Sequence, residues 1–209
     1  MAKLEIIARQ SAHPTGWLGQ IVARVMAHDT ARANRRVIER LAPKPGDRVL
    51  ELGCGHGRAL RRVAARTEPG LAAGVDPSTV MLSVARRHLR RAIDAGTARV
   101  DRGEAGAIPH AGEAFDKAFS VHSVYFWPDL DAGLRELRRV LRPRGELLLA
   151  FHDGSSAVLR AELPASVYRL RSAEEIARAL ETAGFRDVRR ETDRETGLCL
   201  ACARREDSQ

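Results

Sequence analysis

The chain has 209 residues and a formal net charge of +8, with 44% hydrophobic and 4% aromatic residues. This length suits one domain, and its core must be mainly aliphatic. No apolar run approaches the roughly 20 residues that cross a bilayer, and the start lacks the apolar stretch of a signal peptide, so we expect a cytoplasmic protein with no membrane partner.

Most of the basic residues are arginines, scattered over several expected helices and partly interleaved with acids. Stacking aromatic residues do not accompany them, as they would in a single-strand binder. We therefore expect no nucleic-acid partner, although the charge keeps that alternative open. Cys199 and Cys202 lie three apart on an expected strand, where they face opposite sides of the sheet, so we expect no metal site.

The first part of the chain favours helix and the rest alternates between strand and helix. A helical apolar pattern runs from Trp17 to Leu41, and the breaker cluster from Pro43 to Asp47 ends it. Further helices are expected over 58–66, 78–93, 129–141 and 173–183. The helix beginning near Ser78 has that residue as its N-cap, and Gly184 ends the last helix. Strands are expected over 48–52, 71–75, 99–101, 115–121, 146–151, 185–191 and 198–203.

This alternation predicts an α/β fold with a doubly wound, mostly parallel seven-stranded sheet. The last two strands are joined by a short connection, which permits only an antiparallel pair. We expect a single Rossmann-like domain over 1–209, with an N-terminal helical extension or lid over 1–42 and a catalytic core over 46–204. A monomer or a homodimer would both be compatible with this organisation.

A glycine-rich turn between the first strand and its helix is the main chemical signal. Gly53, Gly55 and Gly57 allow the backbone to approach a ligand closely, and the following helix directs its free N–H groups there. Asp76 follows the next strand, at a position where a carboxylate can accept both hydroxyls of a ribose. Glu51 suits a cationic ligand group better than a pyrophosphate, which argues against a dinucleotide.

These residues belong to a longer set of ordered motifs. Its segments are Val49 to Gly57, Gly74 to Ser78, Met81-Leu82, Ala85-Arg86, Gly103 to Ala105 with Ile108-Pro109, Phe115-Asp116, Trp127 to Asp129, and Leu137 to Gly145. The set resembles the class I (Rossmann-like) S-adenosylmethionine-dependent methyltransferases of the small-molecule, type 11-like branch. Two departures from the family pattern are Glu104, where aspartate is usual, and Arg144, where the first glycine of a Pro-Gly-Gly turn is usual.

The resemblance implies S-adenosylmethionine as cofactor, S-adenosylhomocysteine as product, and a role for each matching position. Glu51 would hold the amino end of the methionine, and Asp76 would bind the ribose. Glu104 and the backbone of Ala105 would contact the adenine. The remaining expected cofactor contacts are Gly53, Cys54, Gly55 and Gly57 in the turn, Pro77, Ser78 and Met81 beside the adenine, and Ser120 and Val121 at the end of the fourth strand.

The acceptor should lie beyond the carboxyl ends of the strands. His122 and His152 follow the fourth and fifth strands and are the candidate catalytic residues, because an imidazole can deprotonate a hydroxyl or orient an amine. Candidate pocket residues are Trp17, His28, Tyr125 and Trp127. We expect methyl transfer to an oxygen, nitrogen or carbon atom of a small molecule. An RNA or DNA methyltransferase, or a non-catalytic module that binds the cofactor, are the alternatives.

Overall fold

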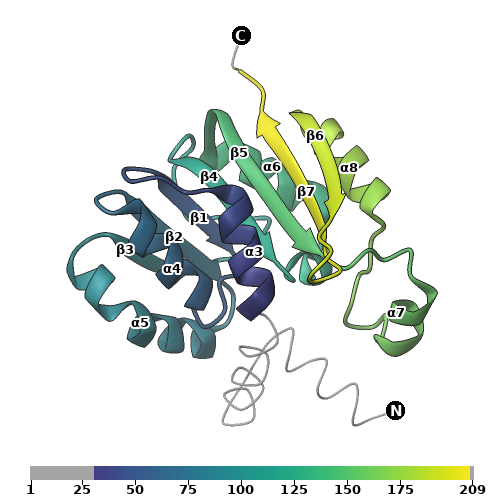
Figure 1. Ribbon diagram of the computed structural model, residues 1–209, viewed down its shortest axis with the longest axis horizontal. Helices are drawn as coiled ribbons and strands as arrows, with labels where there is room; N and C mark the ends of the chain where they lie inside the picture. Colours follow the sequence, from purple (N-terminus) through teal and green to yellow (C-terminus); the bar gives the residue numbers. More distant parts are fainter. Residues whose placement is uncertain (1–30, 208–209) are drawn as a thin grey trace.

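The computed structural model describes residues 31–207, and these form one sheet with helices on both faces (Figure 1). The strands are β1 (Arg48–Leu52), β2 (Leu71–Asp76), β3 (Ala98–Arg102), β4 (Phe115–Val121), β5 (Leu141–Phe151), β6 (Phe185–Thr192) and β7 (Cys199–Arg205). The helices are α3 (Ala31–Leu41), α4 (Arg58–Thr67), α5 (Thr79–Asp94), α6 (Leu130–Val140), α7 (Ala157–Glu162), α8 (Ala173–Thr182) and the 3-10 helix η1 (Val124–Phe126).

The strand order is β3-β2-β1-β4-β5-β7-β6. Strands β1 to β5 pair in parallel, whereas β7 lies antiparallel between β5 and β6. The expected seven-stranded, doubly wound sheet with an antiparallel C-terminal pair is therefore confirmed. The order reverses at β1 and β4, whose carboxyl ends consequently flank the crevice in which such folds bind ligands.

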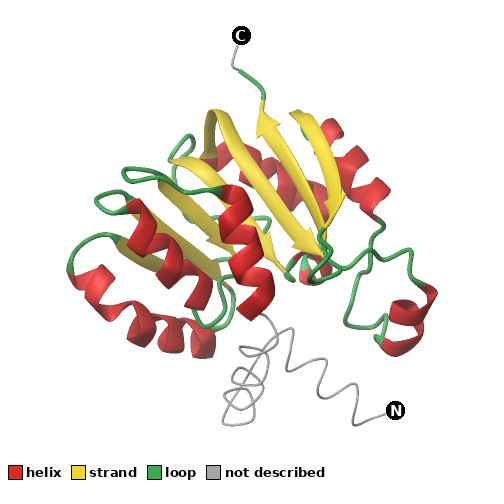
Figure 2. Cartoon of the chain, viewed as in Figure 1, coloured by secondary structure: helices red, strands yellow, loops and turns green. Residues whose placement is uncertain are grey.

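Helices lie on both faces of the sheet (Figure 2), and each face has its own apolar core. Helices α3, α4 and α5 cover one face, and α6 and α8 cover the other. Four of the five phenylalanines are fully buried between these layers. The two cysteines of β7 face opposite cores, as the period of a strand requires: Cys199 belongs to the α6–α8 side and Cys202 packs against the α3–α5 side.

Helix α3 is part of this packing, because Val37 and Ile38 are fully buried against the sheet. The rest of the expected N-terminal extension lies outside the described residues. No helix among residues 31–207 is long and apolar enough to cross a membrane.

Two local features differ from the expected elements. Strand β5 begins at Leu141, earlier than expected, because Leu141 pairs with Phe115 before the turn and pairing resumes at Glu146. The expected Pro-Arg-Gly turn is thus a bulge within the strand, with Arg144 in the left-handed region at φ 63°. The short helices η1 and α7 were not expected, since neither is long enough to give a periodic apolar pattern.

The loop after β3 is held in place by one ion pair of α6. The Arg139 guanidinium lies 2.6 Å from the Glu136 carboxylate and donates to the carbonyls of Ile108 and His110. Glu136 in turn accepts the backbone N–H of Ile108 at 2.8 Å. The guanidinium beside it lowers the pKa of Glu136. These bonds fix the loop that carries Glu104 at the edge of the crevice.

Candidate active site

The turn after β1 is built from three glycines in the left-handed region. Gly53, Gly55 and Gly57 have φ values of 78°, 50° and 74°, which a residue with a Cβ adopts only at a cost. The N–H groups of Gly53 and Cys54 both donate to the carbonyl of Val75 at the end of β2. The turn is therefore tied to the neighbouring strand, and α4 starts directly behind it.

Two of these glycines meet different surroundings. A Cβ on Gly53 would lie 2.3 Å from Ser123 Oγ, so the turn and the loop after β4 are in direct contact there. A Cβ on Gly55 would meet no protein atom within 4 Å. Gly53 therefore allows Ser123 to pack against the turn, whereas Gly55 borders open space that a ligand can enter.

Asp76 connects the turn to the start of α5. Its carboxylate accepts the N–H of Gly55 at 2.8 Å and the N–H of Ser78 at 2.9 Å. The Ser78 hydroxyl accepts the N–H of Met81, which confirms Ser78 as the N-cap of α5. Asp76 is 8% exposed. A carboxylate oxygen has acceptor sites for more than one hydrogen bond.

Glu51 is the buried carboxyl group of the site. It is 4% exposed at the end of β1, and among the described residues its Oε2 atom has no hydrogen-bond partner. Burial raises its pKa well above the ordinary value, the negative charge of Asp76 adds to the rise, and the N–H of Leu60 opposes it. A buried acceptor without a partner is unfavourable. This carboxyl group is therefore suited to a ligand that brings a positive charge and N–H donors.

The other two side chains of the turn are held by their neighbours. Cys54 is buried, and burial raises the pKa of its thiol, so no reactive thiolate is expected. Desolvation lowers the pKa of His56 to about 4, with Arg58 and His88 adding to the effect. The ring of His88 bonds through Nδ1 to the carbonyl of His56 at 2.8 Å. These contacts link α5 to the turn.

The residues expected around an adenine lie at the ends of β2 and β3. Met81 and Ala105 are buried, Pro77 is half-buried and Glu104 is exposed. Ala105 packs close to Gly133 of α6. An apolar floor and an exposed carboxylate are thus available at this edge of the crevice.

At the end of β4, Ser120 and Val121 lie between the glycine turn and the next strand. Ser120 is 1% exposed, and its hydroxyl oxygen has no hydrogen-bond partner among residues 31–207. Val121 is half-buried. A second unsatisfied polar atom is therefore buried near the carboxyl end of the sheet.

The two candidate catalytic histidines are brought together. Their ring centroids are 5.2 Å apart, because β4 and β5 are neighbours and His122 and His152 each follow one of them. The backbone of His122 is left-handed, at φ 53°, a strained conformation that concentrates at functional sites. Desolvation lowers the pKa of His122 to about 4, with His152 adding to it, and also lowers the pKa of His152. Both imidazoles are therefore neutral at pH 7.

The hydroxyl group of Tyr125 contacts both histidines. It accepts the backbone N–H of His152 and lies 3.5 Å from Nδ1 of His122, to which it can donate. Burial raises the pKa of this phenol above its ordinary value. The tyrosine is 5% exposed, so it positions the histidines from within the core.

A set of aromatic rings continues from Tyr125 toward the segment after β5. The ring of Tyr168 lies 6.1 Å from Tyr125 and 5.1 Å from Phe126, and the N–H of Arg169 donates to the carbonyl of Tyr125. Phe126 is absent from the expected site residues, because its neighbourhood depends on η1 and on a loop distant in sequence.

Of the other expected pocket residues, only Trp127 lies among the residues that the structure describes. Trp127 is 4% exposed, donates its indole N–H to Ser123 Oγ at 2.9 Å and packs against Gly133. It holds the loop that touches Gly53, and Ser123 is a residue that sequence reasoning missed. Trp17 and His28 lie outside the described residues. Within residues 31–207 no group of three or more histidine, cysteine or acidic residues could hold a metal ion.

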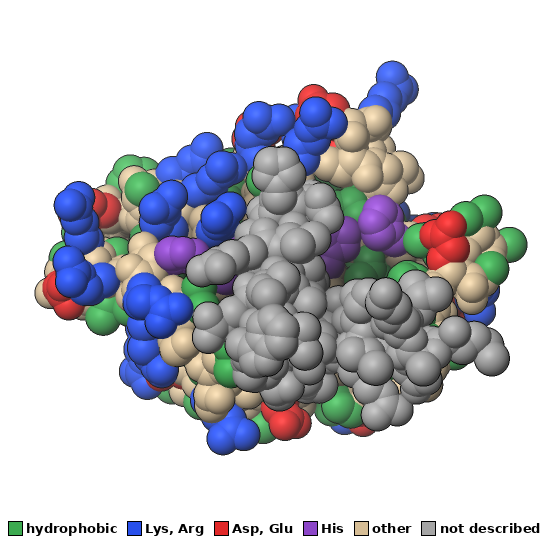
Figure 3. All heavy atoms as spheres, turned by 90° about the horizontal axis from the view of Figure 1, so that it is seen from below, with side chains coloured by type: hydrophobic (Ala, Val, Ile, Leu, Met, Phe, Trp, Pro, Cys, Tyr) green, Lys and Arg blue, Asp and Glu red, His purple; other side chains and the backbone are tan. Residues whose placement is uncertain are grey.

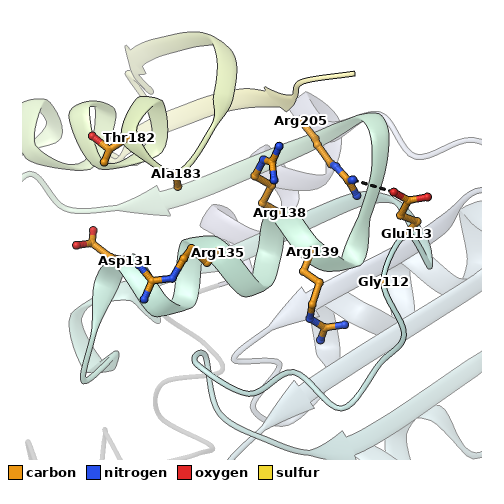
Figure 4. Close-up of a pocket in the computed structure, with 9 residues that line it drawn as sticks. All are labelled: Gly112, Glu113, Asp131, Arg135, Arg138, Arg139, Thr182, Ala183 and Arg205. Atoms are coloured by element: carbon orange, nitrogen blue, oxygen red, sulfur yellow. Dashed lines mark hydrogen bonds and ion pairs between the residues drawn. The ribbon is translucent and has the colours of Figure 1, made fainter. Parts of the chain in front are cut away.

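A cavity of about 720 Å³ lies away from this site, between α6 and the end of α8 (Figure 4). Arginines line much of it, but most are engaged. Arg205 pairs with Glu113 at 2.8 Å, Arg139 is bound to the loop after β3, and Arg138 donates to the carbonyl of Gly184. These contacts brace α6 against the neighbouring segments.

Comparison with known proteins shows that the chain is similar to methyltransferases. Residues 49–145 match the family model of a methyltransferase domain. An O-methyltransferase from Pyrenophora dematioidea is 29% identical over 163 residues, which cover 75% of this chain and 61% of the relative. A 2-phytyl-1,4-naphtoquinone methyltransferase from Synechococcus elongatus is 35% identical over 128 residues, covering 60% and 55%. The chain thus spans little more than half the length of these curated relatives.

Solved structures share the fold at lower identity. A chain from the complex between a methyltransferase activator and the putative methyltransferase of Haloferax volcanii has a TM-score of 0.79 at 20% identity, covering 91% of this chain and 96% of its own. Phosphoethanolamine N-methyltransferase 2 of Haemonchus contortus, solved with S-adenosyl-L-methionine, has a TM-score of 0.72 at 20% identity, covering 85% and 53%.

Proposed function

Since this chain belongs to the class I S-adenosylmethionine-dependent methyltransferases, we propose that it transfers the methyl group of that cofactor to a small, ring-bearing molecule with a hydroxyl group. When bound, the cofactor supplies an activated methyl group on a sulfonium. The protein must then align the acceptor with that methyl group and exclude water.

The buried carboxyl group of Glu51 is the single observation that carries the cofactor assignment. It has no hydrogen-bond partner among the described residues for Oε2, and it lies at the glycine turn, where a cationic amino-acid group would satisfy it. Asp76 would accept the ribose hydroxyls while still bonded to the N–H of Gly55. The open space at Gly55 would receive the methionine portion.

The other cofactor contacts follow the edges of the same crevice. Gly53, Cys54 and Gly57 would line it with backbone, and Ser120 would offer its unsatisfied hydroxyl. Val121 would provide an apolar contact at the end of β4. The adenine would lie among Pro77, Ser78, Met81, Glu104 and Ala105.

On the acceptor side, neutral imidazoles and aromatic rings define the substrate class. The half-buried rings of Phe126 and Tyr168, which contact Tyr125 in the core, favour a planar, apolar acceptor through offset stacking and edge contacts. His122 would accept the hydrogen bond of the acceptor hydroxyl and take its proton as the methyl group arrives. An oxygen that has just gained a methyl group is strongly acidic, so even a weakly basic imidazole can remove that proton.

Two measurements test the proposal in sequence. Isothermal titration with S-adenosylmethionine should show binding, and no heat at millimolar cofactor would contradict the cofactor assignment. Incubation with cofactor and a panel of phenols, hydroquinones, aliphatic amines and carboxylic acids should then give methylated product from the ring hydroxyls. Binding without turnover of any acceptor would instead identify a non-catalytic module, and turnover of amines alone would contradict the acceptor class.

A further inference from the structure

The net charge of this chain is confined to one part of the fold. Residues 31–97, which form α3, α4, α5, β1 and β2, contain 14 basic and 6 acidic residues. Residues 98–207 contain 18 basic and 19 acidic residues. Two of the six acids in the first part, Glu51 and Asp76, are buried in the site. Nearly all the excess positive charge is therefore on the face that α3, α4 and α5 cover.

Helices α4 and α5 carry most of that excess. Together they have eight arginines and a single acid, Asp94. All eight arginines are exposed, and none forms an ion pair with any residue of the described part of the chain. Figure 3 shows basic side chains crowded on the left, the side on which Figure 1 places α4 and α5. The eight residues, called the arginine face below, are Arg58, Arg61, Arg62, Arg66, Arg86, Arg87, Arg90 and Arg91.

The excess of positive charge on these two helices is a local property. Elsewhere arginines are interleaved with acidic residues, and several pair with them: Arg142 lies 2.6 Å from the carboxylate of Asp116, and Arg204 lies 2.9 Å from that of Glu146. On α4, by contrast, Arg62 is followed four residues later by Arg66, and such like-charge pairs destabilise a helix. An anionic partner would offset this repulsion.

We propose that the arginine face docks on an anionic membrane surface. The two helices lie side by side on one face of the sheet, so their outer sides form a broad patch (Figure 1). Clusters of four to eight basic residues bind acidic lipid headgroups. A hollow of about 200 Å³ between α3, α4 and α5, lined by Arg58, Arg61, Arg62 and His88, can receive a lipid phosphate.

Binding on this face is electrostatic and does not involve insertion. Among the described residues, the only large apolar side chain that is strongly exposed is Val158, and it lies on α7. The face also lacks aromatic rings on which nucleic-acid bases could stack. A bilayer is favoured over a nucleic acid because a ring-bearing apolar acceptor partitions into lipid, and in this respect the inference rests on the proposed function. The expectation of no membrane partner rested on the lack of long apolar stretches, which electrostatic binding does not require.

Vesicle co-sedimentation of the full chain tests the inference. The chain should bind vesicles of phosphatidylcholine with about 30 mol% phosphatidylglycerol, and should not bind pure phosphatidylcholine. Raising NaCl from about 0.05 M to about 0.3 M should release it, because the Debye length shortens. The variant Arg61→Gln/Arg62→Gln/Arg87→Gln/Arg90→Gln should bind the acidic vesicles at least about 10-fold more weakly.

A matched control removes four exposed arginines elsewhere, and should keep its vesicle affinity within about twofold. It is Arg135→Gln/Arg178→Gln/Arg186→Gln/Arg189→Gln. Equal losses of affinity in both variants would overturn the inference, and so would binding to neutral vesicles. Duplex RNA that displaces the chain from acidic vesicles, at a phosphate concentration below that of the lipid, would overturn it too. Cofactor titration of the arginine-face variant reports separately on the proposed function, since none of the four residues belongs to the cofactor site.

Discussion

Replacing Glu51 with glutamine should stabilise the protein and weaken cofactor binding at the same time. Glu51→Gln keeps the shape of the side chain but removes its ability to ionise. In wild type, the folded chain holds a proton on Glu51 that the unfolded chain has released, because burial raises the folded pKa. Stability therefore falls as pH rises above the ordinary carboxyl range, and this loss is complete once pH exceeds the raised pKa.

The magnitude follows from the environment of the side chain. Glutamine keeps a buried acceptor and adds an N–H donor, so it recovers only the cost of holding the carboxyl group neutral or desolvated, on the order of 1 kcal/mol. For a chain of this size the melting temperature should rise by roughly 2–4 °C at pH 8. A lost hydrogen bond to a charged group is worth about 1.5–3 kcal/mol, so the cofactor Kd should rise about 10- to 150-fold.

Differential scanning fluorimetry and isothermal titration measure the two effects on the same samples. The surface control is Glu162→Gln on α7, an exposed carboxylate, which should change neither quantity. In wild type, cofactor affinity should rise with pH, since a cationic ligand requires the deprotonated carboxylate; the variant should lose this dependence. A variant that melts at a lower temperature and binds the cofactor as tightly as wild type would refute the reasoning.

Three further predictions concern the turn and the acceptor side. Asp76→Ala should raise the cofactor Kd at least about 10-fold and lower the melting temperature, because two backbone N–H groups lose their acceptor. An unchanged Kd by titration together with an unchanged melting temperature by fluorimetry would contradict this prediction. Gly53→Ala should destabilise far more than Gly55→Ala, since only the former places a Cβ against Ser123; equal unfolding midpoints in urea would count against the geometry. With the pKa of His122 lowered to about 4, kcat/KM for the acceptor, measured at saturating cofactor, should stay constant as pH falls from 8 to about 5 and decline only below that. A midpoint near the ordinary histidine value would exclude His122 as the base.

Most of the sheet could be predicted because its strands are short apolar runs bounded by clear breakers. The expected strand over 115–121 and the N-cap Ser78 agree with the structure. The bulge at Arg144 could not be predicted, because Pro-Arg-Gly has the composition of an ordinary turn and only the pairing of Leu141 with Phe115 makes it part of β5.

The candidate site was predictable where it depends on local order along the chain. The glycine turn, Glu51 and Asp76 lie at strand ends, so their convergence follows from parallel pairing. The contact between Gly53 and Ser123, and the neighbourhood of Phe126 and Tyr168, depend on loop conformations that leave no periodic signal. The concentration of unpaired arginines was likewise hidden, because a linear sequence does not show which helices share a face.

In the proposed function, donor and acceptor would contact separate parts of the chain. The methyl donor would bind at strand ends and at the turn from Gly53 to Gly57, whereas the acceptor would contact η1 and Tyr168, in the long connection between β5 and α8. Insertion, deletion or exchange of that connection would leave the backbone bonds of the turn intact. Acceptor preference can consequently diverge between descendants of one gene while the methyl donor stays the same, and recombination of this connection between homologues is a direct way to redesign specificity.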